Sequence, residues 1–217
     1  MQSRSQILRR LVHPGIIAVI RADSSEQLLD VARALKEGGV AAMEVTMTTP
    51  NALRVIGEVS AKFGREILMG VGTVLDPETC RAAILAGAEY VVTPVLRPEV
   101  IALCRRYGCP VICGAYTPTE ILTAWEAGAD FIKVFPADGL GPNYIKAVKA
   151  PLPQIEIIPT GGVDVTTAAD FIKAGCAAVA AGSSLVGKKA LESRNWAEIT
   201  ATARKFVEVI ARARGPV

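Results

Sequence analysis

The chain has 217 residues, of which 51% are hydrophobic and 21% are charged, with a formal net charge of +3. This composition supports a large buried core and excludes an intrinsically disordered protein. Basic residues are scattered except near the C-terminus, so we expect no nucleic-acid partner. No apolar run approaches the ~20 residues that span a bilayer, and the N-terminus lacks the apolar region of a signal peptide. We therefore expect a cytoplasmic protein without a membrane partner.

The five cysteines include no Cys-x-x-Cys pair, and the single histidine, His13, lies far from all of them in sequence. This spacing does not match a zinc site. Reduced, mostly buried thiols are the expected state in a cytoplasm. We expect neither a metal nor a cofactor.

Taken in chain order, a short amphipathic helix over residues 3–12 is followed by apolar runs that alternate with helix-length segments. The predicted strands are 15–22, 40–47, 67–74, 89–96, 110–116, 131–135, 154–163 and 177–185. Thr49-Pro50 and Thr117-Pro118 are predicted helix starts, because proline suits the first turn of a helix. A last helix is predicted over 196–213.

The junction from helix to strand recurs along the chain as KEGGVAAMEV, LAGAEYVVTP, EAGADFIKVFP and KAGCAAVAAG. In each copy, glycine suits the left-handed end of a helix and an apolar strand follows. Eight strands that alternate with helices predict an α/β fold, a single (β/α)8 TIM barrel over residues 1–217 with its active site at the carboxyl ends of the strands. An open doubly wound sheet is the alternative, although no G-x-G-x-x-G follows the first run.

The sixth run, Phe131–Phe135, has a lysine at its centre. Side chains alternate along a strand, so Phe131, Lys133 and Phe135 share one face. Burial among apolar groups disfavours an ammonium, and a neutral amine can attack a carbonyl to form a Schiff base. A packed stem with the amine reaching water is the simpler alternative.

Other polar residues fall where barrel strands should end. Alternation places Glu44 and Thr46 on one face of the second strand, and a buried glutamate is costly unless it is paired or used. Glu44 is therefore either a structural partner of Arg21 or Lys133, or the proton shuttle of a nucleophilic lysine. The seventh and eighth runs end in PTGG and AGSS, which fit a phosphate or carboxylate site.

Six motifs in this order resemble the 2-keto-3-deoxy-6-phosphogluconate (KDPG) and 2-keto-4-hydroxyglutarate (KHG) aldolases, a family that includes the phosphogalactonate (KDPGal) aldolases. They are M-E-V-T, G-x-G-T-V, V-T-P, F-I-K-V-F-P-A, P-T-G-G-V and G-S-S-L. The resemblance implies a metal-free, usually homotrimeric class I aldolase. Its substrate would be a phosphorylated 2-keto acid, and one of its products would be pyruvate.

The resemblance also assigns roles to residues. Lys133 would form the Schiff base and Glu44 would be the general acid and base. The implied substrate-binding residues are Arg21, Thr73, Pro94, Phe135, Thr160, Gly161, Gly162, Gly182, Ser183 and Ser184.

One position departs from the gluconate-type pattern, which often carries arginine four residues after the glutamate. This chain has Thr48 there and Arg21 at the end of the first strand, where galactonate-type members place an arginine. The preferred keto acid is therefore open between the KDPG or KHG type and the KDPGal type. Two further hypotheses are a sugar-phosphate isomerase or epimerase, in which Lys133 is only a cation, and a non-catalytic small-molecule binder.

Overall fold

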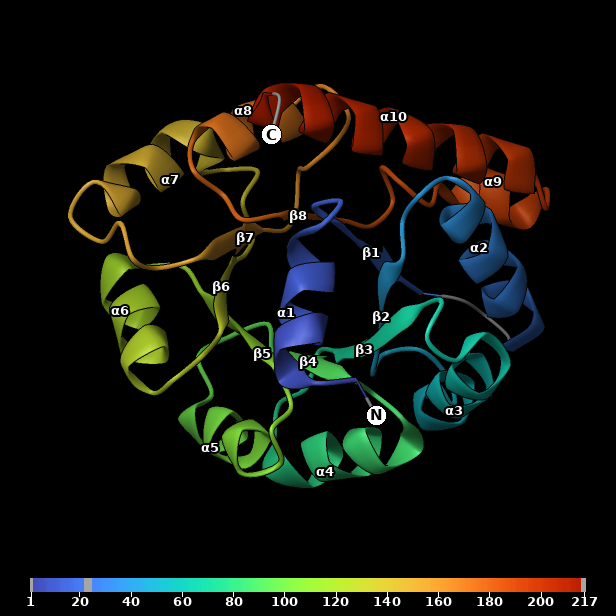
Figure 1. Ribbon diagram of the computed structural model, residues 1–217, viewed down its shortest axis with the longest axis horizontal. Coiled ribbons are helices and arrows are strands. Elements are labelled where there is room, and N and C mark those ends of the chain that lie inside the picture. Colours follow the sequence, from blue (N-terminus) through green and yellow to red (C-terminus); the bar gives the residue numbers. More distant parts are fainter. Residues whose placement is uncertain (1, 22–24, 216–217) are drawn as a thin grey trace.

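The computed structural model describes residues 2–21 and 25–215 of the chain. Within them, eight parallel strands form a barrel surrounded by helices (Figure 1). The strands are β1 (Ile16–Ile20), β2 (Ala42–Thr46), β3 (Leu68–Gly72), β4 (Tyr90–Val92), β5 (Val111–Ala115), β6 (Phe131–Val134), β7 (Ile157–Pro159) and β8 (Val179–Ala181). The sequence places all eight correctly, with shorter bounds than predicted; Ala22, the last residue of the first predicted strand, lies outside the described residues.

Strand pairing confirms the (β/α)8 barrel and rules out the open sheet. The order is β7-β6-β5-β4-β3-β2-β1-β8, in which β1 pairs with both β2 and β8. A single parallel bridge between Thr160 and Ala180 joins the two ends of this order. The carboxyl ends of all strands therefore surround one mouth.

The helices follow the strands around the barrel. They are α1 (Arg4–Val12), α2 (Ser25–Glu37), α3 (Ala52–Phe63), α4 (Pro77–Ala86), α5 (Pro98–Arg106), α6 (Pro118–Glu126), α7 (Gly141–Lys149), α8 (Ala168–Lys173), α9 (Lys188–Glu192) and α10 (Trp196–Arg214). The predicted start at Thr49-Pro50 is wrong: Asn51 takes a left-handed φ of 55° and α3 begins after it. The five-residue helix α9 was not predicted, because it is too short for a periodic apolar pattern.

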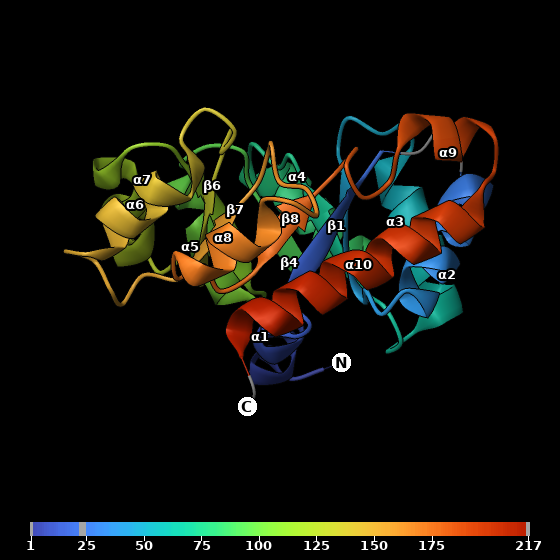
Figure 2. The same ribbon diagram turned by 90° about the horizontal axis from the view of Figure 1, so that it is seen from above.

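Apolar residues fill both the barrel and the space between its strands and helices. Alternate positions on the strands separate these two cores: Phe131 packs inside the barrel, whereas Ile132 packs against the helices. Helix α1 supplies Ile7 and Leu11 to the interior core and so closes the amino-terminal end of the barrel. Figure 2 shows α1 and α9 on opposite sides of the molecule. Because α1 covers the amino-terminal end of the barrel, the end on the side of α9 is left for a site.

All five cysteines are free and buried, as expected from the sequence. Within the described ranges, no helix combines the length and the hydropathy that crossing a membrane requires.

Candidate active site

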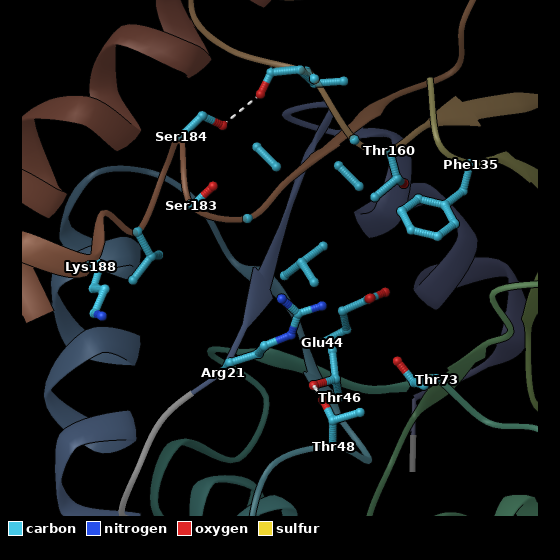
Figure 3. A pocket seen from close by; sticks show the side chains of 18 of the residues that line it. Arg21, Glu44, Thr46, Thr48, Thr73, Phe135, Thr160, Ser183, Ser184 and Lys188 are labelled. Carbon is cyan, nitrogen blue, oxygen red and sulfur yellow. Dashed lines mark hydrogen bonds between the residues drawn. The ribbon is translucent and has the colours of Figure 1, made fainter. Parts of the chain in front are cut away.

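A cavity of about 760 Å³ opens at the carboxyl ends of the strands. Every residue that the sequence nominates lies on its wall, from Arg21 on the first strand-to-helix loop to Ser184 after β8. Figure 3 shows the side chains of Arg21, Glu44 and Thr73 converging on the same space. The structure therefore brings the whole predicted set together.

Lys133 and Glu44 face each other inside the barrel from β6 and β2. The Lys133 Nζ lies 3.7 Å from Glu44 Oε1, and their side chains are only 8% and 2% exposed. Glu44 Oε1 has no hydrogen-bond partner among the described residues. Of the two partners that the sequence left open for Glu44, the structure places Lys133 opposite it. Both groups lie close together and are largely shielded from bulk water.

Two glycines make room at the barrel mouth, one for the Glu44 side chain and one for the loop at Pro94. Gly72 on β3 is in register with Thr46, and a Cβ on Gly72 would lie 2.6 Å from Glu44 Oε1. Gly114 on β5 is in register with Lys133, and a Cβ there would meet the carbonyl carbon of Pro94 at 2.2 Å. Small residues at these positions let a carboxylate and a loop enter the barrel mouth.

Thr73 and Phe135 complete the wall near the pair. Thr73 follows β3 with a φ of 60°, a left-handed conformation that residues other than glycine seldom adopt and that often marks functional sites. Its hydroxyl points into the cavity (Figure 3). The ring centroid of Phe135 lies 5.2 Å from the Lys133 Nζ, so an aromatic face borders the amine.

The loops after β7 and β8 form a glycine-rich wall. Gly161 and Gly162 have φ values of 88° and 70°, which suit glycine and expose backbone groups to the cavity. Ser184 Oγ donates a 2.5 Å hydrogen bond to the Val163 carbonyl, so its hydroxyl joins the two loops. The Ser183 side chain lies on the cavity wall beside it (Figure 3).

Asp164 holds the β7 loop in shape. Its carboxylate accepts hydrogen bonds from the hydroxyl and backbone N–H of Thr166 and from the backbone N–H of Thr167. These bonds lower the pKa of Asp164, the Thr166 hydroxyl having the largest effect. The carboxylate therefore stays charged and fixed at neutral pH.

Sequence reasoning missed several residues of the cavity wall. Gln27 of α2 reaches the wall and donates to the Leu191 carbonyl at 3.5 Å, which links α2 to α9. Thr46 and Thr48, which the sequence did single out, share a 2.7 Å hydrogen bond between their hydroxyls. Lys188, the first residue of α9, also lies on the cavity wall. Lys188 belongs to α9, a helix of five residues, which is too short to give a sequence pattern that would point to this lysine.

The site combines one buried amine, one buried carboxyl group and loops suited to an anion. Among the residues described, no group of three or more histidine, cysteine, aspartate or glutamate side chains is arranged to hold a metal ion. Such a site is suited to covalent catalysis through an amine with a neighbouring general acid and base.

Comparison with known proteins agrees with this chemistry. The family model "KDPG and KHG aldolase" matches residues 7–202. The 2-dehydro-3-deoxy-6-phosphogalactonate aldolase of Escherichia coli K12 is 39% identical over 78% of this chain and 83% of its own length. The 2-dehydro-3-deoxy-phosphogluconate aldolase of Haemophilus influenzae is 33% identical over 94% and 97%.

A solved structure adds the covalent chemistry. The KDPG aldolase of Legionella pneumophila, in which pyruvate was captured as a covalent carbinolamine intermediate, superposes with a TM-score of 0.83 at 28% identity. The match covers 92% of this chain and 97% of that one. With its barrel, its paired lysine and glutamate and a family match over nearly its whole length, this chain belongs to the KDPG and KHG aldolase family, whose members are lyases.

Proposed function

We propose that this protein is a class I aldolase that cleaves a phosphorylated 2-keto-3-deoxy acid to pyruvate and an aldehyde through a Schiff base on Lys133. The observation that carries the proposal is the buried Lys133–Glu44 pair, with 3.7 Å between Nζ and Oε1. The substrate would be KDPG, giving glyceraldehyde 3-phosphate, or the unphosphorylated KHG, giving glyoxylate, or both. The protein would act in the cytoplasm on small molecules, as one domain over residues 1–217, without a metal.

The reaction begins when the proton of Lys133 is on the Glu44 carboxylate. The free amine attacks the C2 ketone, and Glu44 moves the protons that turn the carbinolamine into an imine and release water. The protonated imine accepts the electron pair of the C3–C4 bond as that bond breaks, which leaves an enamine. Glu44 takes the proton of the C4 hydroxyl, so the aldehyde leaves, and returns a proton to C3. Hydrolysis of the pyruvate imine restores the amine.

Binding residues hold the substrate along the cavity. Thr73 and Arg21 would fix the carboxylate, because the breaking bond must be aligned with the imine. Pro94, Phe135 and Thr160 would line the central part of the substrate. Backbone N–H groups of Gly161 and Gly162, with Gly182 and Ser183, would hold the phosphate, whose binding energy positions the reacting carbons. Ser184 would support this wall through its bond to Val163.

One observation favours the KDPGal type as a second candidate. Arg21 lies on the cavity wall, and Thr48 occupies the position where gluconate-type members often carry arginine. The 39% identity with a phosphogalactonate aldolase supports the same candidate. Both candidates use the same mechanism and differ in the configuration at C4.

Pyruvate release tests the proposal. A lactate-dehydrogenase-coupled assay with KDPG, KDPGal and KHG should give pyruvate from at least one of them, and Lys133→Ala should remove almost all of it. An isomerase or epimerase would release none from any substrate. A non-catalytic binder would also keep its ligand affinity in Lys133→Arg. Light scattering tests the homotrimer that the family resemblance implies.

A further inference from the structure

Tyr90 carries a hydroxyl in the barrel interior that has no part in the proposed reaction. Tyr90 on β4 is fully buried, and its hydroxyl has no hydrogen-bond partner among the described residues. An unpaired buried hydroxyl costs about 1–3 kcal/mol. A phenylalanine would fill nearly the same volume without that cost. We therefore looked for a function of the hydroxyl group.

Register places Tyr90 on the same row of the barrel interior as Glu44. Glu44 pairs with Gly70 on β3, and Gly70 pairs with Tyr90 on β4. The far end of the ring lies against Gly70, where a Cβ would be 2.3 Å from Tyr90 Cζ. The phenol therefore extends from β4 over β3, and its hydroxyl lies next to the strand position that adjoins Glu44. Only glycine at position 70 leaves this path open.

The Tyr90 hydroxyl can donate a hydrogen bond, and the Glu44 carboxylate can accept one. Glu44 Oε1 is buried and, like the Tyr90 hydroxyl, has no hydrogen bond in the described part of the chain. Burial raises the pKa of Tyr90 well above its ordinary value, and the charges of Glu44 and Glu89 raise it further. The phenol therefore keeps its proton and remains a donor. Glu89 has its own partner, since it accepts a 2.9 Å hydrogen bond from Gln2.

We propose that Tyr90 is a positioning residue for Glu44, donating a hydrogen bond to its carboxylate during turnover. This inference rests on the proposed aldolase reaction and extends it. The charge on the Lys133 nitrogen, 3.7 Å from Glu44 Oε1, changes as the amine, the protonated imine and the enamine form in turn. A neutral donor whose own charge does not change during the cycle would keep the Glu44 carboxyl group oriented while the charge beside it changes. Tyr90 keeps its own proton throughout and does not touch the substrate.

Tyr90→Phe tests this role, because it removes one oxygen and keeps the ring. We expect kcat for pyruvate release to fall about tenfold or more, the effect of losing a hydrogen bond to a charged group. We expect KM to change little, since no substrate contact is lost. The kcat–pH profile should also differ from that of the wild type, because Glu44 loses a hydrogen-bond donor while Lys133 and Arg21, nearby cations of the cavity, are unchanged.

Two controls separate this role from a structural one. Tyr107→Phe, an exposed tyrosine at the end of α5, should leave kcat and the profile unchanged. In a Glu44→Gln background, Tyr90→Phe should have no further effect on kcat, because the two residues act as a unit. The midpoint of urea unfolding should be equal or higher in Tyr90→Phe, since an unpaired buried hydroxyl is removed.

A measurement without turnover distinguishes failure of this inference from failure of the proposed function. Carbon-13 NMR of labelled glutamate side chains, with Glu44→Gln to assign the signal, should show a changed chemical shift of the Glu44 carboxyl carbon in Tyr90→Phe. If the wild-type chain releases no pyruvate but this signal still moves, the aldolase proposal fails and the Tyr90–Glu44 contact stands. An unchanged Glu44 signal together with an unchanged kcat–pH profile would overturn the inference.

Discussion

Replacing Gly72 with alanine tests whether the position of the Glu44 carboxyl group controls turnover. The new Cβ would lie 2.6 Å from Glu44 Oε1 and 3.0 Å from its Cδ. Ordinary contact begins at 3.4 Å, so the carboxyl group must move by about 0.8 Å. The backbone itself should accept alanine, because the φ of Gly72 does not lie in the left-handed region.

A displacement of this size is enough to slow the reaction. A shift of about 1 Å in a reacting group can cost about 10²-fold in rate. We therefore expect kcat for pyruvate release to fall about 10- to 100-fold. Overpacking should also lower the free energy of unfolding by about 1–3 kcal/mol, which leaves a folded protein to assay.

Coupled pyruvate assays and urea unfolding of the same preparations measure the two effects. Gly57→Ala on α3 is the matched control, because its Cβ would meet the Ala86 carbonyl oxygen at an ordinary 3.4 Å. It should keep wild-type kcat and gain about 0.5–1 kcal/mol, since alanine is the better helix former. A folded Gly72→Ala variant with wild-type kcat would refute the link between the Glu44 position and turnover.

Three further predictions concern other parts of the barrel. Leu11→Ala should lower the free energy of unfolding by about 2–5 kcal/mol in urea and leave kcat unchanged, because this buried side chain lies at the end of the barrel away from the cavity; a loss below 1 kcal/mol would contradict the role of α1 as a plug. Asp76→Ala should cost about 1 kcal/mol at pH 7, because the Asp76 carboxylate caps α4 through a 2.6 Å bond from Thr79 N–H. That bond lowers the pKa of Asp76, so its stabilisation is present above the ordinary pKa and is lost as pH falls through the lowered value; a difference from wild type that persists in strong acid would be inconsistent with this. Ser184→Ala should raise KM for a phosphorylated substrate several-fold with little change in kcat, because the bond to the Val163 carbonyl is lost; equal KM values would exclude a supporting role for that bond.

The fold could be predicted from the sequence because one local pattern recurs. Most helix-to-strand junctions carry glycine followed by an apolar run, and such units pair in parallel through crossover helices. The start of α3 could not be predicted from Thr49-Pro50, because the left-handed turn at Asn51 depends on how the chain leaves β2. Helix α9 is too short to give a periodic signal.

The site was predictable to the extent that its residues follow strands. Alternation on a strand and the shared mouth of a barrel bring Glu44 and Lys133 together without further information. The hydrogen bond from Ser184 to the Val163 carbonyl joins two loops that are distant in sequence, so no local sequence pattern predicts it. The contact of Tyr90 with Gly70 depends on interstrand register, which the sequence leaves open.

Borohydride trapping tests the central claim most directly. The protein is incubated with carbon-14 pyruvate and sodium borohydride, which reduces an imine to a stable amine, and the labelled peptide is identified by mass spectrometry. The account predicts one pyruvate-derived group per chain on Lys133 and no labelling in Lys133→Ala. Labelling that is absent, or that falls on another lysine while Lys133 stays unmodified, would contradict it.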